Sequence, residues 1–95
     1  MPRYVIERDI PEIGSAERDA LREASQQSNG VLAEMKAENK SIQWEHSYVA
    51  GDKTFCIYIA DEETLIHEHA ERSGFPATKV TVVKGMIDPV TAEAS

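Results

Sequence analysis

Hydrophobic residues recur along the chain with two spacings, alternating in some stretches and recurring every three or four residues in others. Alternation is typical of a strand with one buried face, and the longer spacing is typical of an amphipathic helix. Turn-forming residues such as Pro11, Gly14 and Pro76 separate the stretches. The pattern predicts four strands, over 3–10, 42–49, 54–60 and 78–87, and two helices, over 15–38 and 61–73.

Each predicted helix has one hydrophobic stripe and recognisable ends. Ser15 and Asp61 are predicted N-caps, because their side chains can accept hydrogen bonds from the first free backbone N–H groups. Gly74 is predicted to end the second helix, since glycine adopts the left-handed conformation found there. The stripes comprise Leu21, Ala24, Ser28, Val31, Leu32 and Met35 in the first helix and Leu65, Ile66, His69, Ala70 and Ser73 in the second.

The order of these elements predicts the fold. Two strand–helix units joined by a hairpin are typical of a ferredoxin-like βαββαβ sandwich of the α+β class, a four-stranded antiparallel sheet with two helices on one face. The other face is left for a ligand or a second copy, and we expect a homodimer that buries it, because so small a chain leaves apolar surface uncovered. Residues 1–95 are expected to form a single domain, with 88–95 as a loose tail.

The hairpin allows two registers, and the first follows from its turn. If Gly51 and Asp52 form a two-residue turn, His46 lies opposite Ile57. We favour this register because it sorts the hydrophobic residues cleanly onto a face that looks like a core. That face comprises Ile42, Trp44, His46, Tyr48, Phe55, Ile57 and Ile59.

The second register is shifted by one residue, as a bulged loop would produce. It pairs His46 with Cys56 and brings Tyr58 beside Trp44. This arrangement would create a polar and aromatic pocket. Trp44, Tyr58 and Tyr48 are therefore candidates to line such a pocket.

Composition and charge exclude several classes of protein. The 95 residues include 10 Lys or Arg and 17 Asp or Glu, a formal charge of −7 with histidine neutral. We expect no nucleic-acid partner, since its binders need a basic surface, whereas metal cations are favoured. No apolar run approaches the ~20 residues of a membrane span, so no membrane partner is expected. Cys56 is the sole cysteine and cannot form an internal disulfide, so a reducing cytoplasm is the expected location.

Four side chains have the chemistry of metal ligands, and each has a simpler structural reading. Neutral imidazole suits transition metals, but His46 on its strand and inward-pointing His69 on its helix are also typical of hydrogen-bonded structural histidines. Cys56 is either a soft ligand or nucleophile, or a small hydrophobic core residue. Glu7 is either a ligand on the open sheet face or a solvated ion-pair partner. His67 lies on another helix face and is predicted to be solvated.

Several short segments together resemble a family of small bacterial proteins of unknown function for which nickel binding is described. The segments are 4–11 (YVIERDIP), 30–34 (GVLAE), 44–49 (WEHSYV), 56–60 (CIYIA), 68–70 (EHA) and 74–77 (GFPA). The resemblance covers nearly the whole chain apart from the last few residues. It implies a ferredoxin-like sandwich, commonly dimeric, with no established catalytic activity. Glu45 stands where an apolar residue is expected, and the recurrent polar positions are matched by Glu7, His46, Cys56, Tyr58 and His69.

Three functions remain open at this point. The first is a cytoplasmic nickel-binding protein that acts in binding or sequestration rather than catalysis, its coordination completed by water or a second subunit. The second is a dimeric small-molecule binder or enzyme with a cavity on the sheet face, and the third is an interaction module. No Ser-His-Asp arrangement, Cys-x-x-Cys pair or phosphate-binding glycine loop is present, and no catalytic residue is predicted. The predicted metal ligands are His46, Glu7, Cys56 and His69.

Overall fold

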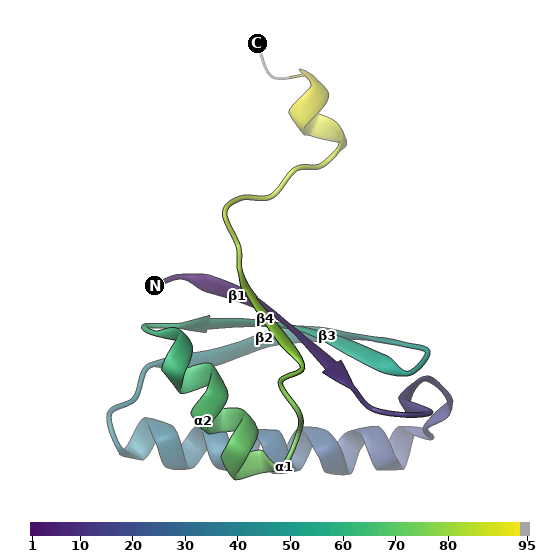
Figure 1. Ribbon diagram of the computed structural model, residues 1–95, viewed down its shortest axis with the longest axis vertical. Coiled ribbons are helices and arrows are strands. Elements are labelled where there is room, and N and C mark those ends of the chain that lie inside the picture. The colour runs from purple at the N-terminus through teal and green to yellow at the C-terminus, as the bar shows by residue number, and fades with distance from the viewer. Residues whose placement is uncertain (94–95) are drawn as a thin grey trace.

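Two helices lie on one side of a four-stranded antiparallel sheet in the computed structural model, which describes residues 1–93 (Figure 1). The strands are ordered β2-β3-β1-β4, as a ferredoxin-like sandwich requires, and the predicted fold is confirmed. The elements are β1 (Arg3–Asp9), α1 (Arg18–Ala37), β2 (Ile42–Ala50), β3 (Lys53–Ala60), α2 (Glu63–Ser73) and β4 (Lys79–Val82), with short 3-10 helices η1 (Ile13–Ser15) and η2 (Pro89–Glu93).

The β2–β3 hairpin contains both predicted registers, one on each side of a bulge. Gly51 has a φ of 60°, and from this turn the strands pair as predicted as far as His46, which lies opposite Ile57. The register then shifts between His46 and Trp44, so that Trp44 lies opposite Tyr58. An unpaired residue in one strand changes which face the following side chains occupy. The bulge therefore turns Trp44 toward the helices while His46 stays on the open face.

Most of the residues predicted to form the core face of the hairpin lie instead on the open face of the sheet. This part of the prediction is wrong. Cys56 and Tyr58 of β3 are buried beneath the helices, together with Tyr4 and Ile6 of β1. The side chains of β3 that alternate with them lie half-exposed on the other side. Both alternating sets of β3 are hydrophobic, so alternation by itself could not choose between them. The residues moved to the open face are His46, Tyr48, Phe55, Ile57 and Ile59.

The helix stripes are confirmed by burial, but the helix starts differ from the prediction. Val31 and Met35 of α1 and Ile66 of α2 join the core. Ser15 belongs to η1 and Asp61 precedes the cap of α2, so neither is an N-cap; Glu17 and Glu62 hold those positions without a side-chain capping bond. Gly74 ends α2 with a φ of 81°, as predicted.

The last strand is shorter than the predicted 78–87, because the chain leaves the sheet after Val83 donates a hydrogen bond to the carbonyl of Arg3. Beyond it the chain runs away from the body to η2, on the side opposite the helices (Figure 1). Met86 and Ile87 are largely exposed on this segment. Residues 94 and 95 of the predicted tail lie outside the described part. Neither helix combines the length and hydrophobicity needed to cross a membrane within residues 1–93.

Candidate functional site

The open face of the sheet carries two of the predicted ligands, His46 on β2 and Glu7 on β1. His46 is exposed and its ring meets the edge of the Tyr48 ring, with 5.2 Å between centroids. The pairing of both strands with β3 places His46 and Glu7 two strands and two residues apart. With strands ~4.8 Å apart and a rise of ~3.4 Å per residue, their Cα atoms are separated by roughly 12 Å. The two side chains would have to extend fully toward each other to reach one ion.

Charged groups on this face already have partners. Lys53 lies 3.6 Å from a carboxylate oxygen of Glu7 and 3.4 Å from one of Asp9, and these carboxylates raise the pKa of Lys53. Arg3 donates to Glu45 at 2.5 Å, and this hydrogen bond lowers the pKa of the Glu45 carboxyl. The bulge residue Glu45 thus adds an ion pair to the open face. All of these groups are partly exposed, so water competes with each pair.

The other two predicted ligands, Cys56 and His69, lie on the helix side of the sheet. Cys56 is 5% exposed, with its Sγ 3.5 Å from the hydroxyl of Thr54. His69 is 1% exposed, and its Nε2 lies 3.2 Å from the Ser28 hydroxyl, which lies 3.4 Å from the hydroxyl of Tyr58. Burial, with a smaller effect of the Arg8 charge, lowers the pKa of His69 to about 4. The imidazole is therefore neutral at pH 7, and its buried Nδ1 has no hydrogen-bond partner among residues 1–93.

The sheet thus divides the four predicted ligands into two pairs, His46 with Glu7 and Cys56 with His69. In the described part of the chain, no three His, Cys, Asp or Glu side chains gather closely enough to hold a metal ion. A structural metal site normally supplies three or four protein ligands. A single chain therefore offers separated donors rather than a closed site, and the metal ligation of these four residues stays a prediction.

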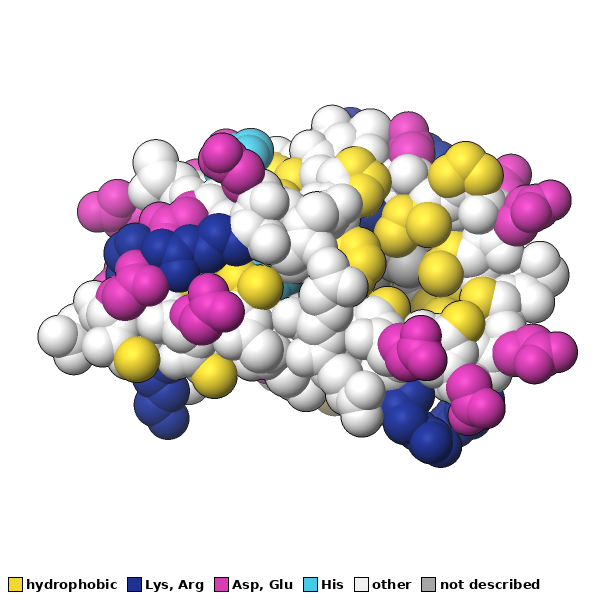
Figure 2. Space-filling model, turned by 90° about the horizontal axis from the view of Figure 1, so that it is seen from below, with side chains coloured by type: hydrophobic (Ala, Val, Ile, Leu, Met, Phe, Trp, Pro, Cys, Tyr) yellow, Lys and Arg dark blue, Asp and Glu magenta, His cyan; other side chains and the backbone are white. Residues whose placement is uncertain are grey.

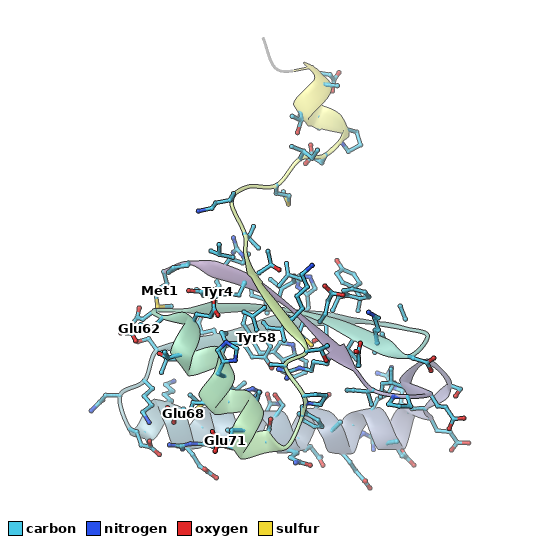
Figure 3. All side chains as sticks on the ribbon, viewed as in Figure 1. Met1, Tyr4, Tyr58, Glu62, Glu68 and Glu71 are labelled. Carbon is cyan, nitrogen blue, oxygen red and sulfur yellow. The ribbon has the colours of Figure 1, made fainter. Side chains whose placement is uncertain are left out.

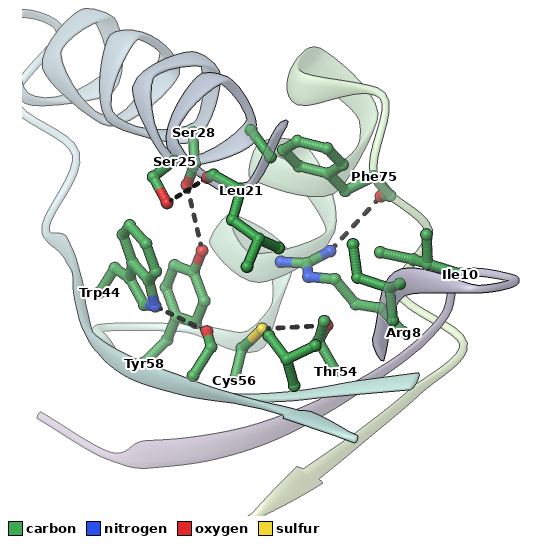
Figure 4. Close-up of a pocket in the computed structure, with 14 residues that line it drawn as sticks. Arg8, Ile10, Leu21, Ser25, Ser28, Trp44, Thr54, Cys56, Tyr58 and Phe75 are labelled. Atoms are coloured by element: carbon green, nitrogen blue, oxygen red, sulfur yellow. Dashed lines mark hydrogen bonds between the residues drawn. The ribbon is translucent and has the colours of Figure 1, made fainter. Parts of the chain in front are cut away.

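A pocket of about 230 Å³ lies between α1 and the sheet (Figure 4). Trp44 and Tyr58 are among its lining residues, and their stacked rings have centroids 6.4 Å apart. Tyr48 does not line the pocket, because it is 63% exposed on the open face. Figure 3 shows Tyr58 between the sheet and the helices. The pocket lies where α2 does not reach, and Figure 2 shows hydrophobic side chains gathered around a hollow on that half of the helix side.

The pocket residue that the sequence reasoning did not single out is Arg8. Its side chain is directed into this pocket and is 3% exposed, and its Nη1 donates to the backbone carbonyls of Pro76 at 3.0 Å and Phe75 at 3.4 Å. The signal was available, because Arg8 follows Tyr4 and Ile6 at two-residue intervals and strand alternation gives all three the same face. The pocket therefore has one permanently charged group in an otherwise largely hydrophobic wall.

The family described as "Nickel responsive protein SCO4226-like" matches residues 4–83, which run from β1 to just beyond β4. The structure is similar to the crystal structure of SCO4226 from Streptomyces coelicolor A3(2), with a TM-score of 0.70 and 16% identity over 90% of this chain and 99% of that chain. At that identity the likeness shows a shared fold. No curated protein matches the chain.

Proposed function

The chain belongs to the SCO4226-like family of nickel responsive proteins, and from this premise we propose that it binds nickel, acting in binding or sequestration rather than catalysis. The observation that carries the proposal is the extent of the family match, which takes in the whole sheet and both helices. Nickel accepts nitrogen, oxygen and sulfur donors, and the chain has all three. Its net charge of −7 favours a divalent cation over an anion as a general partner.

We place the metal on the open face, with His46 as its main ligand. The exposed imidazole of His46 reaches solvent, and Glu7 can exchange its 3.6 Å contact with Lys53 for a metal ion. On the helix side, Nε2 of His69 already faces Ser28, and the charge of Arg8 opposes a second cation nearby. Burying an ion there without a neutralising carboxylate would carry a large desolvation cost. These observations favour His46 and Glu7 over Cys56 and His69.

A second copy of the chain would complete the site. An isologous pair places the same face of each protomer against the other, so every donor is presented twice. The open face carries a hydrophobic strip that such a pair would cover, formed by Val5, Phe55, Ile57 and Ile59. The proposed state is therefore a cytoplasmic homodimer, with nickel held by histidine and carboxylate donors and by water.

Nickel calorimetry on the intact protein at pH 7.5 tests this proposal, with the variants His46→Ala and Cys56→Ser. Wild type and Cys56→Ser are expected to take up nickel without a sulfur-to-metal charge-transfer band, while His46→Ala loses uptake. Affinity should weaken as the pH is lowered, because only neutral imidazole binds metal. Equal uptake by wild type and His46→Ala would overturn the assignment of the site. No heat or spectral change at millimolar nickel would overturn the function.

A further inference from the structure

We propose that the pocket between α1 and the sheet binds a small carboxylate with an apolar body, and that Arg8 holds the carboxylate. Within residues 1–93, no carboxylate lies at ion-pair distance from Arg8. Its known partners are two neutral backbone carbonyls and the face of Tyr58, whose centroid is 5.9 Å from the guanidinium carbon. A buried guanidinium with no counter-ion is costly, and an anionic ligand would remove that cost.

The free donors of Arg8 give the site its geometry. A guanidinium has five N–H donors in a planar fork that matches a carboxylate. Nη1 donates to Pro76 and Phe75, and the guanidinium also interacts with the Tyr58 hydroxyl, which leaves further N–H donors without a partner among the hydrogen bonds of residues 1–93. Figure 4 shows the guanidinium entering the pocket from β1, with Tyr58 and Trp44 across from it. The hydroxyl of Tyr58 also borders the pocket and can donate to an anion while it accepts from Ser28.

The other residues that line the pocket favour a ligand whose remaining part is apolar. Ile10, Leu21, Trp44 and Phe75 line the pocket together with other hydrophobic side chains. Its volume of about 230 Å³ lies below the ~300 Å³ at which drug-sized ligand pockets begin, so the ligand must be small. The protein as a whole is acidic, and acidic side chains stand around this hollow (Figure 2). General attraction of anions is therefore weak, and binding depends on Arg8 in particular.

A purely structural role for Arg8 is the competing explanation. Its bonds to Phe75 and Pro76 tie β1 to the loop between α2 and β4, and this contact alone would account for a buried arginine without any ligand. That role requires only Nη1 and makes no distinction between acids and their neutral analogues. Carboxylate binding instead predicts a clear preference for the charged ligand.

Trp44 allows a direct measurement, because it is the single tryptophan of the chain and lines the pocket. Its fluorescence is followed while the intact protein is titrated in Tris buffer with phenylacetate, neutral phenylacetamide, acetate or inorganic phosphate. Phenylacetate is expected to bind saturably and at least about tenfold more tightly than phenylacetamide, as for a lost hydrogen bond to a charged group. Acetate and phosphate, which lack an apolar body, should bind more weakly still.

Two variants locate the charge responsible. Arg8→Met should remove the preference for phenylacetate over phenylacetamide, whereas Arg3→Met is a matched control on the opposite face of β1 and should keep it. The proposal is overturned if wild type binds acid and amide equally, if it shows no saturable response, if phosphate binds as well as phenylacetate, or if folded Arg8→Met keeps the preference. The wild-type comparison decides the matter should Arg8→Met fail to fold.

Discussion

Both faces of the sheet carry polar side chains, but those on the helix side are buried and those on the open face are exposed. On the helix side, Arg8 and His69 are nearly inaccessible, and their partners belong to the same chain. On the open face, His46 and Glu7 reach solvent, and their neighbours are exposed side chains such as Lys53. On the helix side, a single chain therefore forms the whole pocket. The open face offers separated donors that only a second copy would bring together.

A single strand supplies both environments. Alternate residues of β3 point to the helices and to the open face, so Cys56 and Ile57 are neighbours in sequence but lie on opposite sides of the sheet. What distinguishes the two sides is coverage: α1 and α2 pack on one, while no described helix covers the other (Figure 1). The residue type alone therefore does not determine whether a donor side chain is buried in the core or accessible to a ligand.

The largest expected effect comes from placing a charge on the open face. Ile57→Lys puts an ammonium group in the middle of the hydrophobic strip, and burying it against a second copy would cost far more than the interface gains. Light scattering at micromolar concentration should give a dimer for wild type and a 10.6 kDa monomer for the variant. Gln26→Lys on the exposed side of α1 is the control and should stay dimeric. A monomeric wild type would contradict the proposed assembly.

The next effect concerns two histidines on α2 that differ in burial. His69→Ala should lower the free energy of unfolding by roughly 1–3 kcal/mol, because it leaves a cavity and removes the partner of buried Ser28. His67→Ala should be nearly neutral, since His67 is exposed and its Nε2 lies 3.1 Å from an equally exposed carboxylate oxygen of Glu63. Urea denaturation of both variants measures the difference. Equal unfolding midpoints would mean that the buried ring of His69 contributes no more to stability than the exposed ring of His67.

A smaller effect should be visible as a pH dependence of stability. Burial holds the pKa of His69 at about 4 in the folded chain, below its ordinary value of 6.5. The unfolded chain therefore binds a proton first as pH falls, and His69 makes stability decline between about pH 6.5 and 4. Urea denaturation at pH 7 and pH 5 should show a smaller loss for His69→Gln than for wild type. If wild type and His69→Gln lose the same stability between pH 7 and pH 5, titratable groups other than His69 cause the decline.

Element order and periodicity were sufficient to predict the fold and the inward direction of His69. They could not predict the shift at Glu45, because a bulge depends on how the strands twist against their neighbours. They also misplaced the core of β3, since both of its alternating sets are hydrophobic. The side of the sheet on which Cys56 lies depended on that same choice, and metal ligation by Cys56 stays a prediction. Arg8 was not singled out, although strand alternation places it on the same face as Tyr4 and Ile6.

The most direct test of the account is a crystal of the protein grown with nickel and measured at the nickel absorption edge. We expect an anomalous peak beside the imidazole of His46 on the open face, with donors from a second copy or water around it. A peak beside Cys56 or His69 on the helix side would contradict the proposed division of roles between the two faces. Crystals grown in saturating nickel with no protein-bound peak would contradict nickel binding itself.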